Sequence, residues 1–466
     1  MVLMAMLVMP ACFTQQNDVQ ILTPDNFIHL IRQHHPIAKQ SAIRLQSAEA
    51  GLLAASGNFD PELTVAASGK TFTGKDYYQY QNAGLKIPLP VGNLSAGIEN
   101  NKGDYLLTEL SKGQSSFLGV ELPLASGLVT DKRRAALQKA KTFVKQSEQE
   151  RLAVLNDLFF DAYKAYWQWA GCHQLVKIYD RFMGIAQERL RLVKIGYDQG
   201  DRARADTLEA FAQLQSYAMQ QNEAQLKLRE AELELSNFLW AEDNLAYQLP
   251  QNYLPDSTML TTVHEGTPVA TTEIAPGLDK NPTLESYRHK LAWLGTEKKL
   301  KFQSLLPYVA LKYNVLNKEY QPFKNLTPDF VANNNKFSIQ FSMPLFLREA
   351  RGEYKKAQLK ISETNLEFMY KKQQLLNKIK LYLNEQQLVY QQLLNAQQVY
   401  NSYWGLLQNE LLKFRQGESA LFLVNSRENK VIELLQKKNE LHVKYQKAIY
   451  AAKWAAGTLV VGLPAQ

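Results

Sequence analysis

Apolar side chains recur at alternating spacings of three and four along two long stretches of the chain. Over residues 155–197 every position of this spacing is apolar or aromatic, and over 376–414 only two glutamines are polar. Such a period, sustained over many turns, is typical of coiled-coil helices. The pattern predicts helices over about 128–199 and 348–416, each roughly 100 Å long at a rise of 1.5 Å per residue.

A glycine follows each of these long helical patterns. Gly200 and Gly417 can adopt the left-handed conformation that ends a helix, so each allows the chain to reverse. Asp201 and Glu418 come next, where an acidic side chain favours the start of the returning helix. The sequence therefore predicts two long antiparallel helical hairpins.

Short alternating segments precede both long helices. Residues 337–343 and 309–315 alternate apolar and polar side chains, and residues 63–67 keep the same phase with less hydrophobic side chains. These patterns predict strands with one apolar and one more polar face. Aromatic residues gather at the strand ends and loops, as in an interfacial girdle: Tyr77, Tyr78, Tyr80, Tyr313, Tyr320, Phe323 and Phe330. Taken alone, these strands also fit the edge of a water-soluble β-sandwich.

The chain is a tandem repeat. Pro36 and Pro282 each begin a helical segment and lie 246 positions apart, whereas Pro123 and Pro344, which follow matching strands, lie 221 apart. The two turn glycines are separated by 217 positions. Three landmarks in the same order indicate duplication. The falling separation locates about 25 extra residues in the first repeat, near 73–100, which either add a hairpin to the strands or lengthen an external loop.

These patterns divide the chain into five segments. We expect a signal remnant and N-terminal segment (1–26), a first repeat (27–240), a proline-rich extended connector (241–280), a second repeat (281–456) and a tail (457–466). Within the repeats, strands are expected at about 61–123 and 307–344, and the helical hairpins turn near residues 200 and 417. The expected fold class is mostly α with β, in a tandem structural repeat.

The N-terminus indicates export. The first eleven residues are apolar and a polar run follows Cys12, as at the end of an export signal. Cys12 follows a small residue and resembles the lipid-accepting cysteine of a bacterial lipoprotein. The alternative is an unmodified cysteine in or beside an ordinary cleaved signal.

The composition of the chain excludes several classes of protein. No stretch reaches the eighteen or so consecutive apolar residues of a spanning helix, whereas a transmembrane β-barrel leaves little trace in hydropathy. The 53 Lys and Arg against 45 Asp and Glu give a net charge of +8, but the basic residues are spread among acidic ones and form no stripe for nucleic acid. Two cysteines exclude a disulfide framework and a Cys-based zinc module.

The sequence offers no site for catalysis, a cofactor or a metal. His29 lies five positions before His34, which is not the spacing of three or four that places two ligands on one helix face. Cys172 occupies a heptad position, which favours a packed core thiol over a nucleophile. No phosphate-binding glycine loop or nucleophile elbow is present. We therefore do not expect an enzyme.

The exported two-repeat chain resembles the TolC family of outer-membrane efflux proteins. Five segments carry the resemblance: the strand-to-helix links 122–124 and 343–345, the segment 127–133, and the turns 197–200 and 414–417. Their order and duplication make the likeness specific. It covers nearly the whole chain after the export signal.

The resemblance implies a homotrimer in the outer membrane of a Gram-negative bacterium. In the family, strands of three subunits close one transmembrane β-barrel, and the helices continue it as an α-barrel across the periplasm. Such proteins are passive exit ducts for efflux or type I secretion, and they dock on a periplasmic adaptor and an inner-membrane pump. By this likeness the docking tip here contains Gly200, Asp201, Arg202, Gly417 and Glu418. Drugs, metal ions and secreted polypeptides leave through similar ducts.

Two alternatives stay open at this point. Some relatives constrict the tip with acidic rings, whereas here Leu421 and Leu423 belong to an apolar run that predicts either a hydrophobic constriction or plain helix packing. The chain as a whole could instead be a soluble coiled-coil scaffold with a small dimerisation sheet. That class explains the heptads, but not the export-like start or the paired strands.

Overall fold

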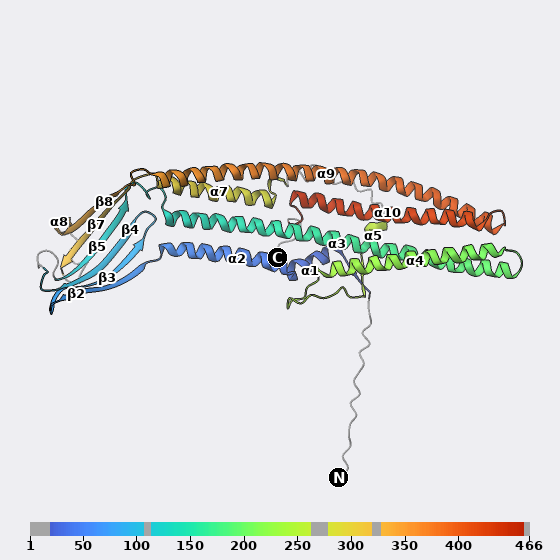
Figure 1. Ribbon diagram of the computed structural model, residues 1–466, viewed down its shortest axis with the longest axis horizontal. Coiled ribbons are helices and arrows are strands. Elements are labelled where there is room, and N and C mark those ends of the chain that lie inside the picture. The colour runs from blue at the N-terminus through green and yellow to red at the C-terminus, as the bar shows by residue number, and fades with distance from the viewer. Residues whose placement is uncertain (1–18, 107–112, 262–277, 319–327, 461–466) are drawn as a thin grey trace, which may run out of the picture. The chain divides into compact units, whose positions relative to one another are not determined.

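The computed structural model describes residues 19–106, 113–261, 278–318 and 328–460. Two compact units make up the chain. Unit 1 comprises Met1–Ser41, Leu152–Asn281 and Gln374–Gln466, and unit 2 comprises Ala42–Arg151 and Pro282–Gln373. Most of the described residues are helical and the rest include one large sheet, which confirms the mostly α fold with β structure (Figure 1).

Unit 2 contains a six-stranded sheet in which every neighbouring pair is antiparallel. Its order is β2-β3-β4-β5-β7-β8, with β2 and β8 as the two edges (Figure 1). The strands are β2 (Glu62–Phe72), β3 (Lys75–Pro88), β4 (Asn93–Lys102), β5 (Gly113–Pro123), β7 (Tyr308–Lys318) and β8 (Asn335–Ser342). The short helix α8 (Pro328–Asn333) precedes β8.

The extra residues of the first repeat are the hairpin β3–β4. This hairpin lies between β2 and β5 in the sheet, so these residues add strands and do not simply lengthen a loop. Gly92 ends its turn with φ +85°, a conformation that favours glycine. The first repeat thus supplies four strands of the sheet and the second repeat two.

Four helices flank the sheet along the chain. The first repeat enters through α2 (Pro36–Ser56) and the one-turn helix η1 (Gly57–Phe59), and it leaves through α3 (Lys132–Asp198). The second repeat enters through α7 (Pro282–Gln303) and leaves through α9 (Arg348–Arg415). The helices α3 and α9 each contribute residues to both units.

Ion pairs tie α7 to both long helices within unit 2. Lys139 of α3 pairs with Glu297 of α7 at 2.5 Å, and Lys301 of α7 pairs with Glu353 of α9 at 3.0 Å. These side chains are partly or fully exposed, so solvent screens both pairs and each contributes little to the stability of the fold.

Unit 1 packs the two helical hairpins around an aromatic core. The returning helices are α4 (Arg204–Ser236) and α10 (Leu421–Ala456). Side chains from α3, α4, α9 and α10 form one buried cluster that includes Phe182, Tyr217, Leu407 and Val424. Tyr179, Ala186 and Leu407, which the sequence pattern places at heptad positions, also belong to this cluster, so these positions supply part of the contact between the hairpins.

The N-terminal segment and the connector also fold onto unit 1. Strand β1 (Gln20–Leu22) pairs in parallel with β6 (Tyr253–Pro255), and the short helix α5 (Thr258–Thr261) follows. The Tyr166 hydroxyl donates to the Leu22 carbonyl at 2.7 Å and accepts from the Asp256 N–H at 3.0 Å. A buried side chain of α3 thus fixes both segments.

The start of the first helix differs from the sequence expectation. Helix α1 (Pro24–His34) begins before residue 27 because Thr23 caps it, with its hydroxyl accepting from the Asn26 N–H. It ends at His35, whose extended backbone is the conformation favoured before a proline. Cys12, the expected lipidation site, lies outside the described residues.

Candidate functional site: a two-faced sheet and paired helical tips

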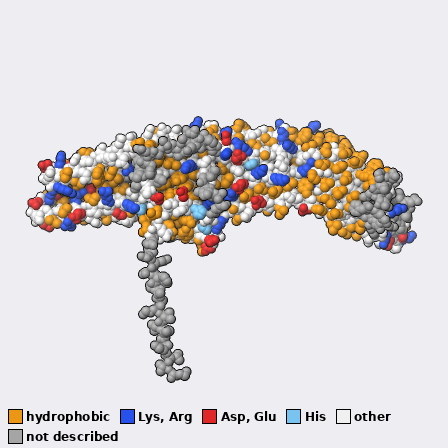
Figure 2. Space-filling view, turned by 180° about the vertical axis from the view of Figure 1, so that it is seen from behind, with side chains coloured by type: hydrophobic (Ala, Val, Ile, Leu, Met, Phe, Trp, Pro, Cys, Tyr) orange, Lys and Arg blue, Asp and Glu red, His pale blue; other side chains and the backbone are white. Residues whose placement is uncertain are grey.

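One face of the sheet in unit 2 carries apolar side chains on all six strands in the half of the sheet that joins the helices. Beyond this half, the same face carries Gln81, Asn100 and Ser116. Residues opposite one another in the register share a face, and one such row reads Leu63, Leu85, Ala96, Leu118 and Val315, and ends at Asn335 on β8. On β8 the same face carries Phe337, Ile339 and Phe341, whose exposed fractions are 67%, 65% and 68%. Figure 2 shows hydrophobic side chains gathered over this part of unit 2.

The opposite face of the sheet is more polar, although it also carries Phe117 and Leu316. One complete row across the six strands reads Glu62, Lys86, Ser95, Gly119, Asn314 and Lys336. A water-soluble antiparallel sheet normally buries its apolar face and exposes its polar one. Here the apolar face carries the most exposed large side chains of the sheet, so it requires an apolar environment outside the single chain.

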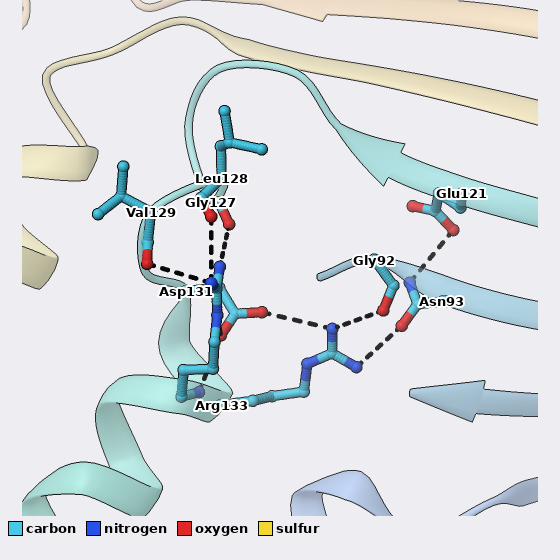
Figure 3. A network of polar contacts seen from close by, with 9 residues as sticks. Gly92, Asn93, Glu121, Gly127, Leu128, Val129, Asp131 and Arg133 are labelled. Atoms are coloured by element: carbon cyan, nitrogen blue, oxygen red, sulfur yellow. Dashed lines mark hydrogen bonds and ion pairs between the residues drawn. The ribbon is translucent and has the colours of Figure 1, made fainter. Parts of the chain in front are cut away.

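A hydrogen-bond network joins the sheet to the start of α3 (Figure 3). The Arg133 guanidinium donates to the Asn93 side-chain oxygen at 2.8 Å, to the Gly92 carbonyl at 3.2 Å and to the Asp131 carboxylate at 3.3 Å. The Asn93 amide donates in turn to Glu121 of β5 at 3.4 Å. Arg133 therefore holds the β3–β4 turn against the base of the helix.

Asp131 and Arg134 shape the link between β5 and α3. The Asp131 carboxylate accepts from the Arg134 N–H at 2.8 Å, which caps the first turn of the helix. The Arg134 side chain donates to the carbonyls of Leu128 and Val129, each at 3.1 Å, and to that of Gly127. The segment 127–133, noted in the sequence, is thus a bend locked by two arginines.

The two hairpin tips of unit 1 are built in the same way. Gly200 and Gly417 have φ values of +86° and +79°. The N–H of the next residue, Asp201 or Glu418, donates to a carbonyl five residues back at 2.8 Å or 2.9 Å. This geometry is the Schellman motif, which satisfies the last carbonyls of a helix and requires a residue at positive φ.

The structure brings the predicted tip residues of both repeats together through Arg202. Its guanidinium carbon lies 4.2 Å from the centre of the Phe414 ring, and its Nη2 donates to the Phe414 carbonyl at 3.3 Å. Gly200, Asp201, Gly417 and Glu418 are exposed, whereas Arg202 is partly buried by this contact.

Leu421 and Leu423 occupy different environments. Leu421 is buried in a cluster with Leu190, Val193 and Ala210, so it packs within its own chain. Leu423 is 43% exposed. Of the two residues, only Leu423 has a side chain free to face a pore.

A buried polar network lies behind the tips, and the sequence patterns did not indicate it. Arg189 of α3 forms a two-pronged ion pair with Glu428 of α10, and their side chains are only 10% and 2% exposed. The Arg189 guanidinium also donates to Asn425 at 3.1 Å, and the Tyr217 hydroxyl donates to Glu428 at 3.3 Å. Removing one member of a buried ion pair costs about 3–5 kcal/mol, so this network fixes the register of the two hairpins.

The remaining titratable groups show no catalytic arrangement. Cys172 is a buried free thiol whose pKa is raised by burial. Among the described residues, no three His, Cys, Asp or Glu side chains lie close enough to share a metal ion. None of the described helices has the length and apolar composition needed to cross a membrane.

The fold is similar to that of outer-membrane channels of known structure. The model of the outer membrane efflux protein family matches residues 27–239. The chain is similar in structure to the CmeC outer membrane channel of Campylobacter jejuni, with 17% identity, a TM-score of 0.64, and 93% of this chain and 85% of that one covered. It is also similar to VceC of Vibrio cholerae, with 14% identity, a TM-score of 0.63, and 93% of this chain and 96% of that one covered. A third similar structure is the open state of MtrE of Neisseria gonorrhoeae, with 14% identity, a TM-score of 0.66, and 93% of this chain and 88% of that one covered. The comparison with curated protein sequences gives no match.

The match of the family model to residues 27–239, a little under half of the chain, supports the resemblance stated from the sequence. The family match and the similar channel structures support the expected role as an efflux exit duct in the Gram-negative outer membrane. Proteins of the family are passive channels, in agreement with the expectation that the chain is not an enzyme. The soluble coiled-coil scaffold is not supported.

Proposed function

We propose that three copies of the chain form one duct, in which their sheets close a transmembrane β-barrel and their helical hairpins continue it as an α-barrel. The exposed apolar face of the sheet is the observation that carries this proposal. In a closed barrel that face contacts lipid, and the polar face, with Lys86, Ser95 and Asn314, lines a water-filled lumen.

The edges of the sheet support closure between copies. Every residue of β2 and of β8 is exposed in the single chain. Unpaired strand edges cannot remain open in lipid, because each backbone N–H and C=O there requires a partner. Pairing β8 of one copy with β2 of the next satisfies both edges.

The helical tips are the proposed docking surface for a periplasmic adaptor, which in turn engages an inner-membrane pump. Gly200, Asp201, Gly417 and Glu418 are exposed at the chain reversals, and the Arg202–Phe414 contact holds the two tips together. An adaptor that reads this surface contacts both repeats at once. Leu423 is the proposed hydrophobic constriction near the tip, and Leu423→Ser is expected to raise leakage of small antibiotics.

The test is the mass of the complex extracted from outer membranes in detergent, measured after cross-linking. For the cross-link, one cysteine is placed in β2 and one in β8, at Thr64 and Gln340, in a background without the native cysteines. A disulfide-linked species at three times the chain mass supports the proposal. A monomer or dimer that shows no β2–β8 cross-link contradicts it.

A further inference from the structure

We infer that the β3–β4 hairpin is part of the barrel wall, so that the assembled duct has eighteen strands and the hairpin supplies two of the pore-lining strands of each copy. This inference rests on the proposed trimer. Three copies of the six-stranded sheet give eighteen strands, and the same sheet without the hairpin would give twelve.

The hydrogen-bond register places the hairpin inside the sheet. Strand β3 is paired with β2 from Lys75 to Lys86, and β4 is paired with β5 from Asn93 to Asn101. The sheet contains no direct β2–β5 pairing. The only continuous path of backbone hydrogen bonds from one edge of the sheet to the other therefore runs through the hairpin.

The half of the hairpin next to its turn continues both faces of the sheet, whereas further out the apolar side carries Gln79, Gln81, Asn100 and Lys102. Ala83, Leu85 and Ile87 of β3 face the same side as Leu94, Ala96 and Ile98 of β4, and this is the apolar face. Asn82, Gly84 and Lys86 share the polar face with Ser95, Gly97 and Glu99. A hairpin surrounded by water on both sides would not need this separation, whereas a wall strand between lipid and lumen does.

Small residues make the polar face suitable for the inside of a curve. A Cβ added to Gly97 would lie 2.6 Å from the Phe117 ring, and one added to Gly119 would lie 2.0 Å from the Asn314 side-chain oxygen. Gly84 stands directly opposite Gly97 in the register. Glycine in a strand interior often marks close approach or a bend, and designed barrels place such glycines where the sheet curves.

The Arg133 network gives the hairpin an attachment at the helical end. The hairpin has no helix of its own, but the Arg133 guanidinium binds Gly92 and Asn93 in its turn (Figure 3). The turn also lies directly on β5, because a Cβ at Gly92 would fall 2.1 Å from the Glu121 carbonyl oxygen. The added strands are thus fixed at the same end as the strands that continue into helices.

The consequence is a wider pore through the membrane. Barrel diameter grows roughly linearly with strand number, so eighteen strands enclose a lumen about one and a half times as wide as twelve. The residues Asn82, Lys86 and Glu99 would line it. We expect this part of the duct to admit solutes of correspondingly larger cross-section.

Thiol labelling of the full-length trimer in lipid vesicles tests the inference. In a background with both native cysteines replaced by alanine, Asn82→Cys and Ala83→Cys are neighbours on opposite faces of β3. We expect a charged, membrane-impermeant maleimide to label Asn82→Cys at least tenfold faster than Ala83→Cys. Equal, fast labelling of both positions would place the hairpin in water outside the wall and overturn the inference.

A deletion gives an independent measurement. Removing residues 73–102 joins β2 to β5 through residues 103–112. The variant should form a trimer whose sheet end excludes polyethylene glycols that are small enough to enter the intact duct. An unchanged polymer cut-off contradicts the inference. Equal labelling or an unchanged cut-off would contradict only the place of the hairpin, because both are measured on assembled trimers. Absence of a trimer in the unmodified protein would instead refute the proposed duct. If the deletion variant does not fold, the labelling ratio decides.

Discussion

Arg202 at the first helical tip covers the ring of Phe414 at the second, with the guanidinium carbon 4.2 Å from the ring centre. The same side chain bonds to the Phe414 carbonyl, which is one of the last carbonyls of α9. One side chain from the first repeat therefore caps the end of a helix in the second. The two tips are coupled directly as well as through the helices behind them.

Replacing Arg202 should loosen both tips together. A cation–π contact contributes about 0.5–1 kcal/mol and a hydrogen bond about 1 kcal/mol, so Arg202→Ala is expected to speed local hydrogen exchange about tenfold around Gly200 and Gly417. Mass spectrometry of peptides from both tips measures this. Arg204→Ala removes a nearby exposed arginine and should change neither tip; loosening confined to the first tip would show that the coupling is absent.

A charged side chain at Gly200 should abolish export without preventing assembly. Nothing lies within 4 Å of a Cβ added there, so Gly200→Lys is limited to the strain of a positive φ, about 1–2 kcal/mol, and changes the proposed docking surface. Drug susceptibility of cells measures export, and cross-linking measures the trimer. Gly184→Lys adds the same charge at another open position of α3 and should export normally. Normal export by Gly200→Lys would mean that the glycine serves chain reversal alone.

Neighbouring positions on β8 should respond oppositely to arginine. Ile339 lies on the apolar face and Gln340 on the polar face. Ile339→Arg is expected to destabilise the trimer by about 2–4 kcal/mol if the site lies near the middle of the bilayer, because the charge would face lipid. Gln340→Arg should have little effect. The readout is the temperature at which the trimer dissociates in detergent, and equal losses for both variants would argue against the assignment of the faces.

Acid should weaken unit 1 through His442. The imidazole is 2% exposed, and its Nε2 has no hydrogen-bond partner among the described residues. Burial, aided by Lys438, lowers the pKa of His442 from 6.5 to about 4. The unfolded chain therefore binds the proton first as pH falls. Stability from this group is complete above pH 6.5 and declines toward pH 4, by about 3 kcal/mol in all.

Urea unfolding at pH 7.5 and pH 4.5 measures this dependence. His442→Leu should reduce the loss of stability between the two pH values, because the variant has no imidazole to protonate there. His29→Leu, at an exposed position, should keep the full loss. An identical loss in the wild type and in His442→Leu would exclude this source of acid sensitivity.

The sequence indicated the helical part of the fold well, for a physical reason. A 3,4 period sustained over forty residues leaves little choice but a packed helix, and a glycine followed by an acidic residue is a strong local signal for reversal. The β3–β4 hairpin was harder to assign. Its first half, from Tyr77 to Asn82, contains only tyrosines and polar residues and has no aliphatic side chain. Its place in the sheet depends on pairing with β2 and β5.

The site residues also fall into two groups, those that a local sequence signal indicated and those that only distant contacts reveal. The tip residues were found because turn chemistry is local, whereas Arg133 was not singled out because its partners Gly92 and Asn93 lie about forty positions upstream. The partner of Arg189 lies 239 positions away. An arginine on a helix gives no sign in the sequence of whether it is solvated or buried in an ion pair, so only the packed structure distinguishes the two.

The direction of the strands explains why the sheet was enlarged by a hairpin. Because every pair is antiparallel, β2 and β8 run in opposite directions, and in the proposed barrel a junction between copies is antiparallel as well. Adding two strands, β3 and β4, leaves β2 and β8 running in opposite directions. It also keeps the end of β5 and the start of α3 at the same end of the strands as η1. A single extra strand would have sent α3 out of the opposite side. Barrels of this kind can therefore widen only in steps of two strands per subunit.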